Sequence, residues 1–178
     1  MLVSEKHADF LLDEFGRYTR DYDVRVARSS AEALSVSQEV RATGGTVALY
    51  VLDGDLPDAH PLEAFGQWRT VVPTARRIIA APYDRFLVEA AALRPGMAKG
   101  KYDAYLLMPQ GPRDEEFHHA VSELLSDWGS TVAAPEALEG AMRGTNEARK
   151  RALGAWKVSH ASRYVRKHVT NNLPDVIR

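Results

Sequence analysis

The stretch at residues 46–58 reads Thr46-Val47-Ala48-Leu49-Tyr50-Val51-Leu52 and then Asp53-Gly54-Asp55-Leu56-Pro57-Asp58. Its first half is a continuous apolar run with β-branched residues, which is typical of a strand buried on both faces of a sheet. Its second half is a polar turn with glycine and proline, which ends the strand abruptly. The run therefore predicts a central strand with Asp53 at its carboxyl end.

Strands and helices are expected to alternate through the first 128 residues. A loop at Pro95–Gly100 is expected to end the fourth helix. Because parallel strands need crossover helices, the alternation predicts an α/β fold with a doubly wound, five-stranded parallel sheet. Apolar runs predict strands at residues 2–3, 23–27, 46–52, 77–81 and 104–107. Helical periodicity, with a serine cap at Ser29 or Ser30, predicts helices at residues 8–18, 30–40, 61–71, 86–93 and 113–128.

The composition excludes several classes of chemistry. The sequence contains no cysteine, which removes disulfides, thiol nucleophiles and thiolate metal sites. No apolar run approaches the roughly 18 to 20 residues that span a bilayer, and Met1-Leu2-Val3 is too short and too uncharged to open a signal peptide. We therefore expect a cytoplasmic protein without a membrane partner, whose chemistry comes from carboxylates, hydroxyls, histidines or backbone groups.

Charge is distributed unevenly along the chain. Residues 1–139 carry 14 Lys and Arg against 22 Asp and Glu, and residues 140–178 carry 9 against 2, so the two parts have formal charges of −8 and +7. This asymmetry predicts an acidic body with a basic arm. With the helical pattern, it divides the chain into a body at residues 1–128, a linker or short helix at residues 129–144 and a basic helical extension at residues 145–178.

The extension has the pattern of a basic amphipathic helix. Thr145 is placed to cap a helix through about Val169, in which Leu153, Trp156, His160 and Tyr164 form one stripe. Such a helix can pack on the body or on a second copy, or it can bind an acidic protein surface, nucleic acid or an anionic membrane. The residues of the extension that we expect to contact a partner are Trp156, Arg163, Arg166 and Lys167.

Functional residues of such a sheet gather at the carboxyl ends of its strands. Those ends read Ser4-Glu5 after the first strand, Asp53 after the third, Ala81 after the fourth and Met108-Pro109 after the fifth. With this spacing, residues 1–128 resemble the receiver domains of bacterial response regulators. The resemblance is closest to receivers fused to thioredoxin-reductase-like flavoproteins, through residues 74–79 and 105–109. It implies a flavodoxin-like sheet in the order 2-1-3-4-5, with Asp53 as the phosphoacceptor.

The resemblance also identifies what this chain lacks. In the family, two acidic residues after the first strand hold Mg²⁺ together with the phosphoacceptor, a Ser or Thr follows the fourth strand, and Lys-Pro follows the fifth. Here Glu5 and Asp53 remain as a weak Mg²⁺ pair, Ala81 supplies no hydroxyl and Met108 supplies no ammonium. Because phosphoryl transfer depends on positioning and charge neutralisation, these losses predict a degenerate receiver that does not signal through phosphorylation.

Three smaller features have competing interpretations. The run Asp53-Gly54-Asp55 also matches the opening of haloacid-dehalogenase-like phosphatases, but Pro57 stands where that motif has Thr, and two strands precede Asp53. Neighbouring residues on a helix point about 100° apart, so His118-His119 cannot readily share a metal. We therefore predict that they lie on a solvated helix face. Tyr105 is either half-buried packing, which we favour, or part of a partner surface.

Two functions remain open at this point. The first is a regulatory, non-enzymatic module that needs no cofactor and binds a protein partner or forms a homodimer, independently of phosphorylation. The second is a response regulator that is phosphorylated at Asp53, with Mg²⁺ as a weak candidate ligand, and whose basic residues 145–169 bind DNA.

Overall fold

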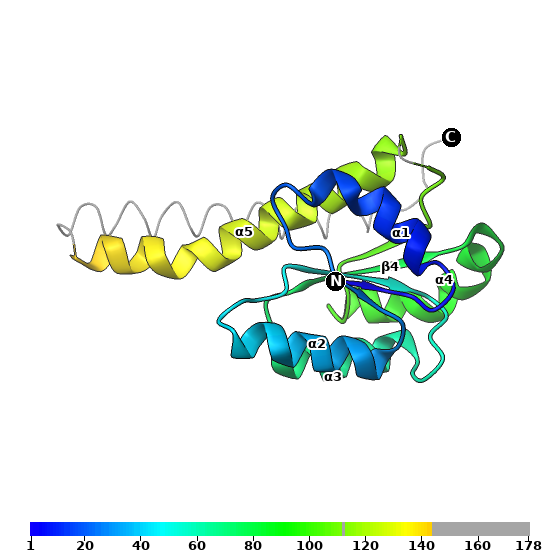
Figure 1. Cartoon of the computed structure of the whole chain (residues 1–178), viewed down its shortest axis with the longest axis horizontal. Coiled ribbons are helices and arrows are strands. Elements are labelled where there is room, and N and C mark those ends of the chain that lie inside the picture. The colour runs from blue at the N-terminus through cyan, green and yellow to red at the C-terminus, as the bar shows by residue number, and fades with distance from the viewer. Residues whose placement is uncertain (112, 144–178) are drawn as a thin grey trace, which may run out of the picture. The chain divides into compact units, whose positions relative to one another are not determined.

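A single parallel sheet with the strand order β2-β1-β3-β4-β5 organises the computed structural model, which describes residues 1–111 and 113–143, with side chains through residue 134 (Figure 1). This order confirms the predicted doubly wound, flavodoxin-like sheet. The strands are β1 (Leu2–Val3), β2 (Val26–Ala27), β3 (Leu49–Asp53), β4 (Arg76–Ala81) and β5 (Ala104–Leu107). The helices are α1 (Ala8–Glu14), the 3₁₀ helix η1 (Phe15–Tyr18), α2 (Ser30–Ala42), α3 (Pro61–Val71), α4 (Tyr83–Ala98) and α5 (Glu115–Arg143).

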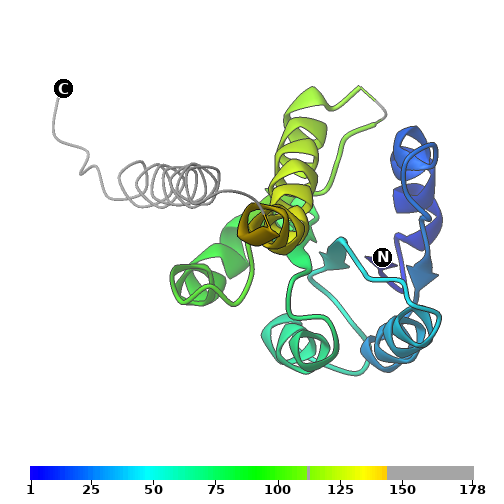
Figure 2. The same ribbon diagram turned by 90° about the vertical axis from the view of Figure 1, so that its left-hand side faces the viewer.

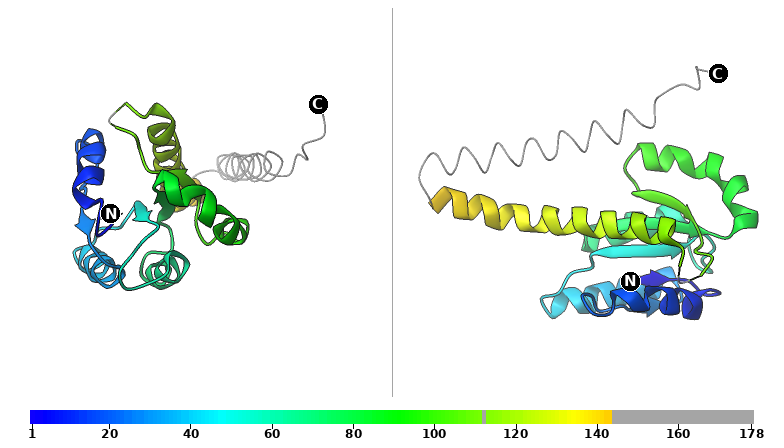
Figure 3. Two further views of the ribbon diagram at one scale, coloured as in Figure 1. Left: turned by 90° about the vertical axis from the view of Figure 1, so that its right-hand side faces the viewer. Right: turned by 90° about the horizontal axis from the view of Figure 1, so that it is seen from above.

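Each face of the sheet has its own apolar core. Side chains alternate between the faces along a strand, so Tyr50 and Leu52 of β3 point to one core while Leu49 and Val51 point to the other. Helices α2, α3 and α4 cover the first face, and α1 with the beginning of α5 covers the second. Figure 2 and the left panel of Figure 3 view this layered arrangement from two opposite sides, and the right panel of Figure 3 views it from above. All residues of β3 are buried, as the unbroken apolar run predicts.

Contacts along the chain separate two compact units, Met1–Gly129 and Ser130–Arg178. The first unit contains the whole sheet. The predicted last helix of the body ends at residue 128, whereas α5 continues to Arg143. The predicted division at residues 128 and 144 stays a prediction, and the expected basic helix at residues 145–169 lies outside the described residues. Among the described residues, no helix is long and apolar enough to cross a bilayer.

Some strands are shorter than the sequence predicts. The apolar run from residue 46 enters the sheet only at Leu49, and the run from residue 23 only at Val26. Strand β3 begins at Leu49, opposite Arg76, the first residue of β4. Strand β2 is short because the two residues of β1 pair on this side only with Val26–Ala27. Since β2 pairs only with β1, it has no partner for further residues.

Helix α4 is longer than predicted, because Pro95 and Gly96 lie inside it instead of forming a loop. A Cβ added to Gly96 would lie 2.9 Å from Leu62 Cδ2 and 3.2 Å from Tyr102 Cε1, so this glycine permits close packing of the helix. The backbone leaves the helix a few residues later, at Gly100, which has a φ of 67°. Glycine is favoured there because left-handed backbone costs it little.

The burial of His118 contradicts a second expectation. We predicted a solvated position, but His118 is buried on α5, and only His119 beside it is exposed. The His118 Nδ1 atom lies 3.0 Å from the Tyr18 hydroxyl, and its Nε2 atom lies 3.6 Å from a carboxylate oxygen of the buried Glu14. These partners come from α1 and η1, about 100 residues earlier in the chain, so the local pattern around His118 gives no sign of them.

The first turn of α2 is held from two directions. Ser29 is the N-cap, and its hydroxyl accepts a hydrogen bond from the Glu32 amide at 3.1 Å. The Asp58 carboxylate, from the loop between β3 and α3, accepts hydrogen bonds from the amides of Ser30 at 2.8 Å and Ala31 at 2.9 Å. Burial alone would raise the pKa of Asp58, but these amides and its own amide lower it below the ordinary value. Asp58 therefore connects the loop to α2.

We expect Asp58→Ala to lower the free energy of unfolding by about 1 kcal/mol, the usual cost of removing a side-chain cap. Two amides at the start of α2 lose their acceptor in this variant. Urea denaturation measures the change, with Asp13→Ala on the exposed side of α1 as the matched control. Equal stability of the two variants would contradict the assigned role of Asp58.

Candidate functional site

The structure brings most of the predicted site residues to the carboxyl edge of the sheet. Asp53 is the last residue of β3 and lies opposite Ala80 of β4. Ser4 follows β1, and its hydroxyl lies 2.8 Å from the Asp53 carboxylate. Ala81 ends β4, and its carbonyl accepts a hydrogen bond from the Met108 amide at 2.8 Å. The backbone positions that the resemblance implies are therefore all present.

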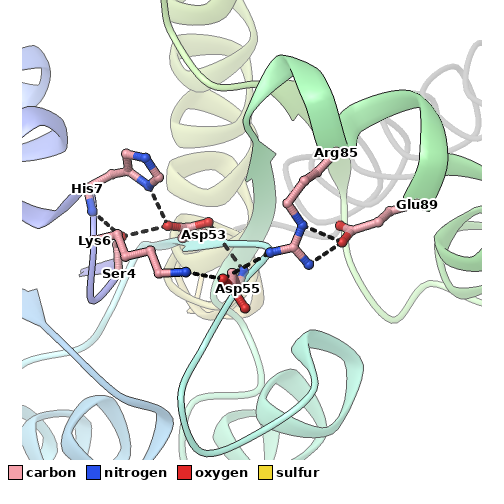
Figure 4. A network of polar contacts seen from close by, with 7 residues as sticks. All are labelled: Ser4, Lys6, His7, Asp53, Asp55, Arg85 and Glu89. Atoms are coloured by element: carbon pink, nitrogen blue, oxygen red, sulfur yellow. Dashed lines mark hydrogen bonds and ion pairs between the residues drawn. The ribbon is translucent and has the colours of Figure 1, made fainter.

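The Asp53 carboxylate is fully buried and already satisfied by neighbours (Figure 4). Its Oδ2 atom accepts hydrogen bonds from Ser4 Oγ at 2.8 Å and from His7 Nδ1 at 2.7 Å. A carboxylate only accepts hydrogen bonds, so the His7 proton lies on Nδ1. The Asp53 Oδ1 atom accepts one from the Asp55 amide at 3.2 Å. Because a buried charge needs such donors, Ser4 and His7 stabilise Asp53 in place.

A second layer of charged side chains surrounds this carboxylate. Asp55 lies 2.6 Å from the Lys6 ammonium and 3.1 Å from the Arg85 guanidinium (Figure 4). Arg85 also donates to Glu89, with its Nε atom 2.8 Å from Oε1. The hydrogen bond from Lys6, followed by that from Arg85, lowers the pKa of Asp55. Asp55 therefore stays ionised, which does not suit the general acid of a phosphatase of the haloacid-dehalogenase type.

Glu89 of α4 places a negative charge close to the turn after β3. A Cβ on Gly54 would lie 3.2 Å from Glu89 Oε2 and 3.9 Å from the Ala81 Cβ. The Glu89 carboxylate and the Ala81 methyl group therefore both lie close to the turn. Because Arg85 donates to this carboxylate, its guanidinium is already engaged within the protein.

Met108 and Pro109 do not compensate for the missing lysine. Both are buried, and Met108 packs in the core on the α1 and α5 side of the sheet with Leu2, Leu11 and Phe117. The carbonyl of Met108 accepts a hydrogen bond from the Gln110 side chain at 3.1 Å. A thioether that serves as core packing offers no cation to a phosphoryl group.

The donor set at the edge does not fit a magnesium ion. Glu5, the other predicted ligand, is exposed, and its carbonyl accepts a hydrogen bond from Arg28 at 3.3 Å. The oxygen of Asp53 that faces Ser4 and His7 is already used by those two donors. Magnesium needs several free oxygen ligands in near-octahedral array. Among the described residues, no group of three or more acidic or histidine side chains could hold a metal.

Tyr105 of β5 is half-buried, as we favoured from the sequence. Its ring stacks on Phe86 of α4, with the ring centroids 4.6 Å apart, and its hydroxyl donates to the Phe86 carbonyl at 2.9 Å. Burial and then the nearby Glu89 raise the pKa of Tyr105 to about 12. Its role in partner binding stays a prediction. The other predicted partner residues, Trp156, Arg163, Arg166 and Lys167, lie outside the described residues.

Solved structures with a similar fold are mostly receiver domains. A CheY-like receiver domain protein from Methanospirillum hungatei matches with a TM-score of 0.56 and 19% identity, over 73% of this chain and 94% of that chain. The receiver domain of an HD domain-containing protein from Pseudomonas fluorescens matches with a TM-score of 0.56 and 18% identity, over 73% and 88%. An adenylate cyclase from Rhodopirellula baltica matches with a TM-score of 0.60 and 13% identity, over 78% and 94%.

These likenesses assign the class of fold: the described body of the chain has the fold of a response-regulator receiver domain. At identities this low, the likeness establishes the fold alone. No family model matches the sequence, and no curated protein matches it significantly.

The sequence reasoning missed four side chains of the site. Lys6 and His7 directly follow Ser4-Glu5, so their position near the strand end was visible, but their partners were not. Arg85 and Glu89 lie one helical turn apart on α4, and the helix was expected to start only at residue 86. An acidic and a basic residue at this spacing is a common helix-surface pair, which conceals their contact with the turn after β3.

We expect Ser4→Ala to lower the free energy of unfolding by about 1–3 kcal/mol, the range for a buried polar group that loses its partner. The Ser4 hydroxyl donates to Asp53 and accepts from the His7 amide, both at 2.8 Å. Chemical denaturation measures the loss, with Ser35→Ala on the exposed side of α2 as control. A Ser4→Ala variant as stable as the control would show that Ser4 does not stabilise Asp53.

Proposed function

We propose that this chain is a receiver-like regulatory module that acts by binding a protein partner or a second copy of itself, without phosphorylation of Asp53. It is a non-catalytic protein in this proposal, and it works in the cytoplasm. The observation that carries the proposal is the state of Asp53, which is fully buried and accepts hydrogen bonds from Ser4 and His7 on one carboxylate oxygen.

Phosphorylation of this carboxylate would require several interactions to be given up. Attack by the Asp53 Oδ2 atom would require its separation from His7 and Ser4, and attack by Oδ1 would require loss of the hydrogen bond from the Asp55 amide. The product would then have no hydroxyl at Ala81 and no ammonium at Met108 to stabilise it. Lys6 and Arg85 are cationic, but both are already paired with Asp55. These contacts favour a fixed site over a switch.

The surface of α4 supports the binding role. Tyr83, Leu87 and Val88 of this helix are 72%, 71% and 79% exposed. Large apolar side chains that are exposed together are a common feature of interaction surfaces. Tyr105 lies beneath the same helix, because its ring stacks on Phe86. We therefore place the binding surface on the exposed side of α4.

The first experiment tests whether Asp53 accepts a phosphoryl analogue. We expect Mg²⁺ and beryllofluoride, added to the full chain, to leave the amide resonances of Asp53 and Ala81 without saturable shifts. The physical reasons are the occupied carboxylate oxygen and the unsuitable metal donors. Heteronuclear NMR measures the shifts, and Asp53→Asn serves as the reference for non-specific effects.

A designed variant provides the positive control for that experiment. Ser4→Asp/Ala81→Thr/Met108→Lys restores an acidic residue, a hydroxyl and an ammonium at the three depleted positions. If the analogue causes saturable shifts in the unmodified chain that are absent from Asp53→Asn, the proposal is wrong. The chain is then better explained as a phosphoacceptor response regulator, whose basic residues 145–169 would be tested for DNA binding with a steep salt dependence.

The second experiment tests self-association through α4. We expect the full chain to sediment as a dimer and Leu87→Glu to sediment as a monomer, since a buried unpaired carboxylate at an apolar interface is costly. The matched control is Leu12→Glu, which changes a leucine of α1 that is 43% exposed. Sedimentation velocity measures the difference. Equal association of both variants would remove α4 as the dimer surface.

A further inference from the structure

A cavity lies at the edge of the sheet opposite to Asp53, within the unit Met1–Gly129. Its volume is about 150 Å³. It is bounded by residues before β2 and β3 and by side chains of η1 and α5. No residue of the site around Asp53 lines it. The side chains that define its chemistry are Phe15, Tyr18, Tyr22, Leu125 and Trp128.

The lining is mainly apolar and aromatic. Phe15 and Tyr18 contact each other with ring centroids 5.2 Å apart, and Leu125 belongs to the core on this side of the sheet. An apolar cavity of about 150 Å³ is large enough to take up a benzene-sized molecule. Both the volume and the rings therefore match an aromatic ligand with a single six-membered ring.

Trp128, one of the residues that line the cavity, has an unsatisfied polar atom. The Trp128 Nε1 atom is buried and has no hydrogen-bond partner among the described residues. A buried donor without an acceptor carries a desolvation cost that a bound acceptor would remove. The Tyr18 hydroxyl, by contrast, is already engaged with His118 Nδ1 at 3.0 Å. A small rotation of the Trp128 side chain, which itself lines the cavity, would therefore let its N–H donate to a ligand there.

The charges at the cavity are neutralised. Arg25 and Asp23 both line it, and they pair with each other at 2.8 Å. The Met1 amine is also in the lining, where burial lowers its pKa from the usual 8.0 to about 5, and it donates to the Leu49 carbonyl at 3.0 Å. That amine is uncharged at neutral pH. An ionic ligand would find no opposite charge that is not already paired.

We infer that this cavity is a binding site for a small neutral aromatic molecule that carries one hydrogen-bond acceptor, with the Trp128 indole as the donor. The ring of the ligand packs against Phe15, Tyr18 and Leu125, and its carbonyl or similar oxygen accepts from Nε1. The inference is independent of the phosphorylation state of Asp53, because the two sites share no residue.

Acetophenone and ethylbenzene are suitable probes, because they have nearly the same shape and only acetophenone has an acceptor. NMR of the full chain follows the Trp128 indole N–H resonance, which is assigned by its loss in Trp128→Phe. We expect acetophenone to move this resonance downfield with saturation. We expect ethylbenzene to bind about fivefold more weakly and to cause no downfield shift, which corresponds to the net value of one hydrogen bond.

Variants separate the hydrogen bond from the apolar packing. In Trp128→Phe, which keeps a ring at this position, the two probes should bind with equal affinity. Phe10→Leu, at an exposed position of α1 that does not line the cavity, is the control and should preserve the difference. Val24→Trp fills the cavity from a half-buried position in its lining and should abolish binding of both probes while the NMR spectrum stays dispersed. Unsaturable shifts in the unmodified chain, or an acetophenone preference that survives Trp128→Phe, would overturn the inference.

Discussion

The site depends on the placement of one charge, because Asp53 is a carboxylate with no exposed surface at the end of a buried strand. A buried charge is tolerated only when hydrogen bonds replace its hydration. Ser4 and His7 from the end of β1 and the Asp55 amide supply them. The two central strands are therefore joined at their carboxyl ends by polar contacts as well as by the β1–β3 ladder.

At the same edge, a receiver fold carries side chains other than those that the resemblance implies. The backbone around Asp53, Ala81 and Met108 retains the relationship that the resemblance implies. The side chains give these positions other tasks: Met108 fills the core, and Ala81 packs beside the turn. Cations are still present near Asp53, but Lys6 and Arg85 belong to ion pairs of the protein itself. Acidic side chains of the protein thus already pair with the cationic groups that a phosphoryl ligand would need.

Much of the fold was predictable, because burial of β3 on both faces leaves an unbroken apolar signal. The site was predictable only in part. Asp53 and Ala81 follow from strand ends, whereas the contacts of His7 and Arg85 depend on side-chain directions between elements that are distant in sequence. His118 was misjudged for the same reason, since Glu14 and Tyr18 lie far from it along the chain. The predicted loop at Pro95 was wrong, because close packing at Gly96 keeps this segment helical although proline and glycine usually end a helix.

The link between Asp58 and α2 has a consequence for the order of folding. The amides of Ser30 and Ala31 find their acceptor 28 and 27 residues further along the chain. While the polypeptide emerges from the ribosome, α2 can form its serine cap at once, but these two amides remain bonded to water until β3 and its turn have been synthesised. The start of α2 therefore gains these two hydrogen bonds only once the loop after β3 is in place, which couples a local element to a non-local contact.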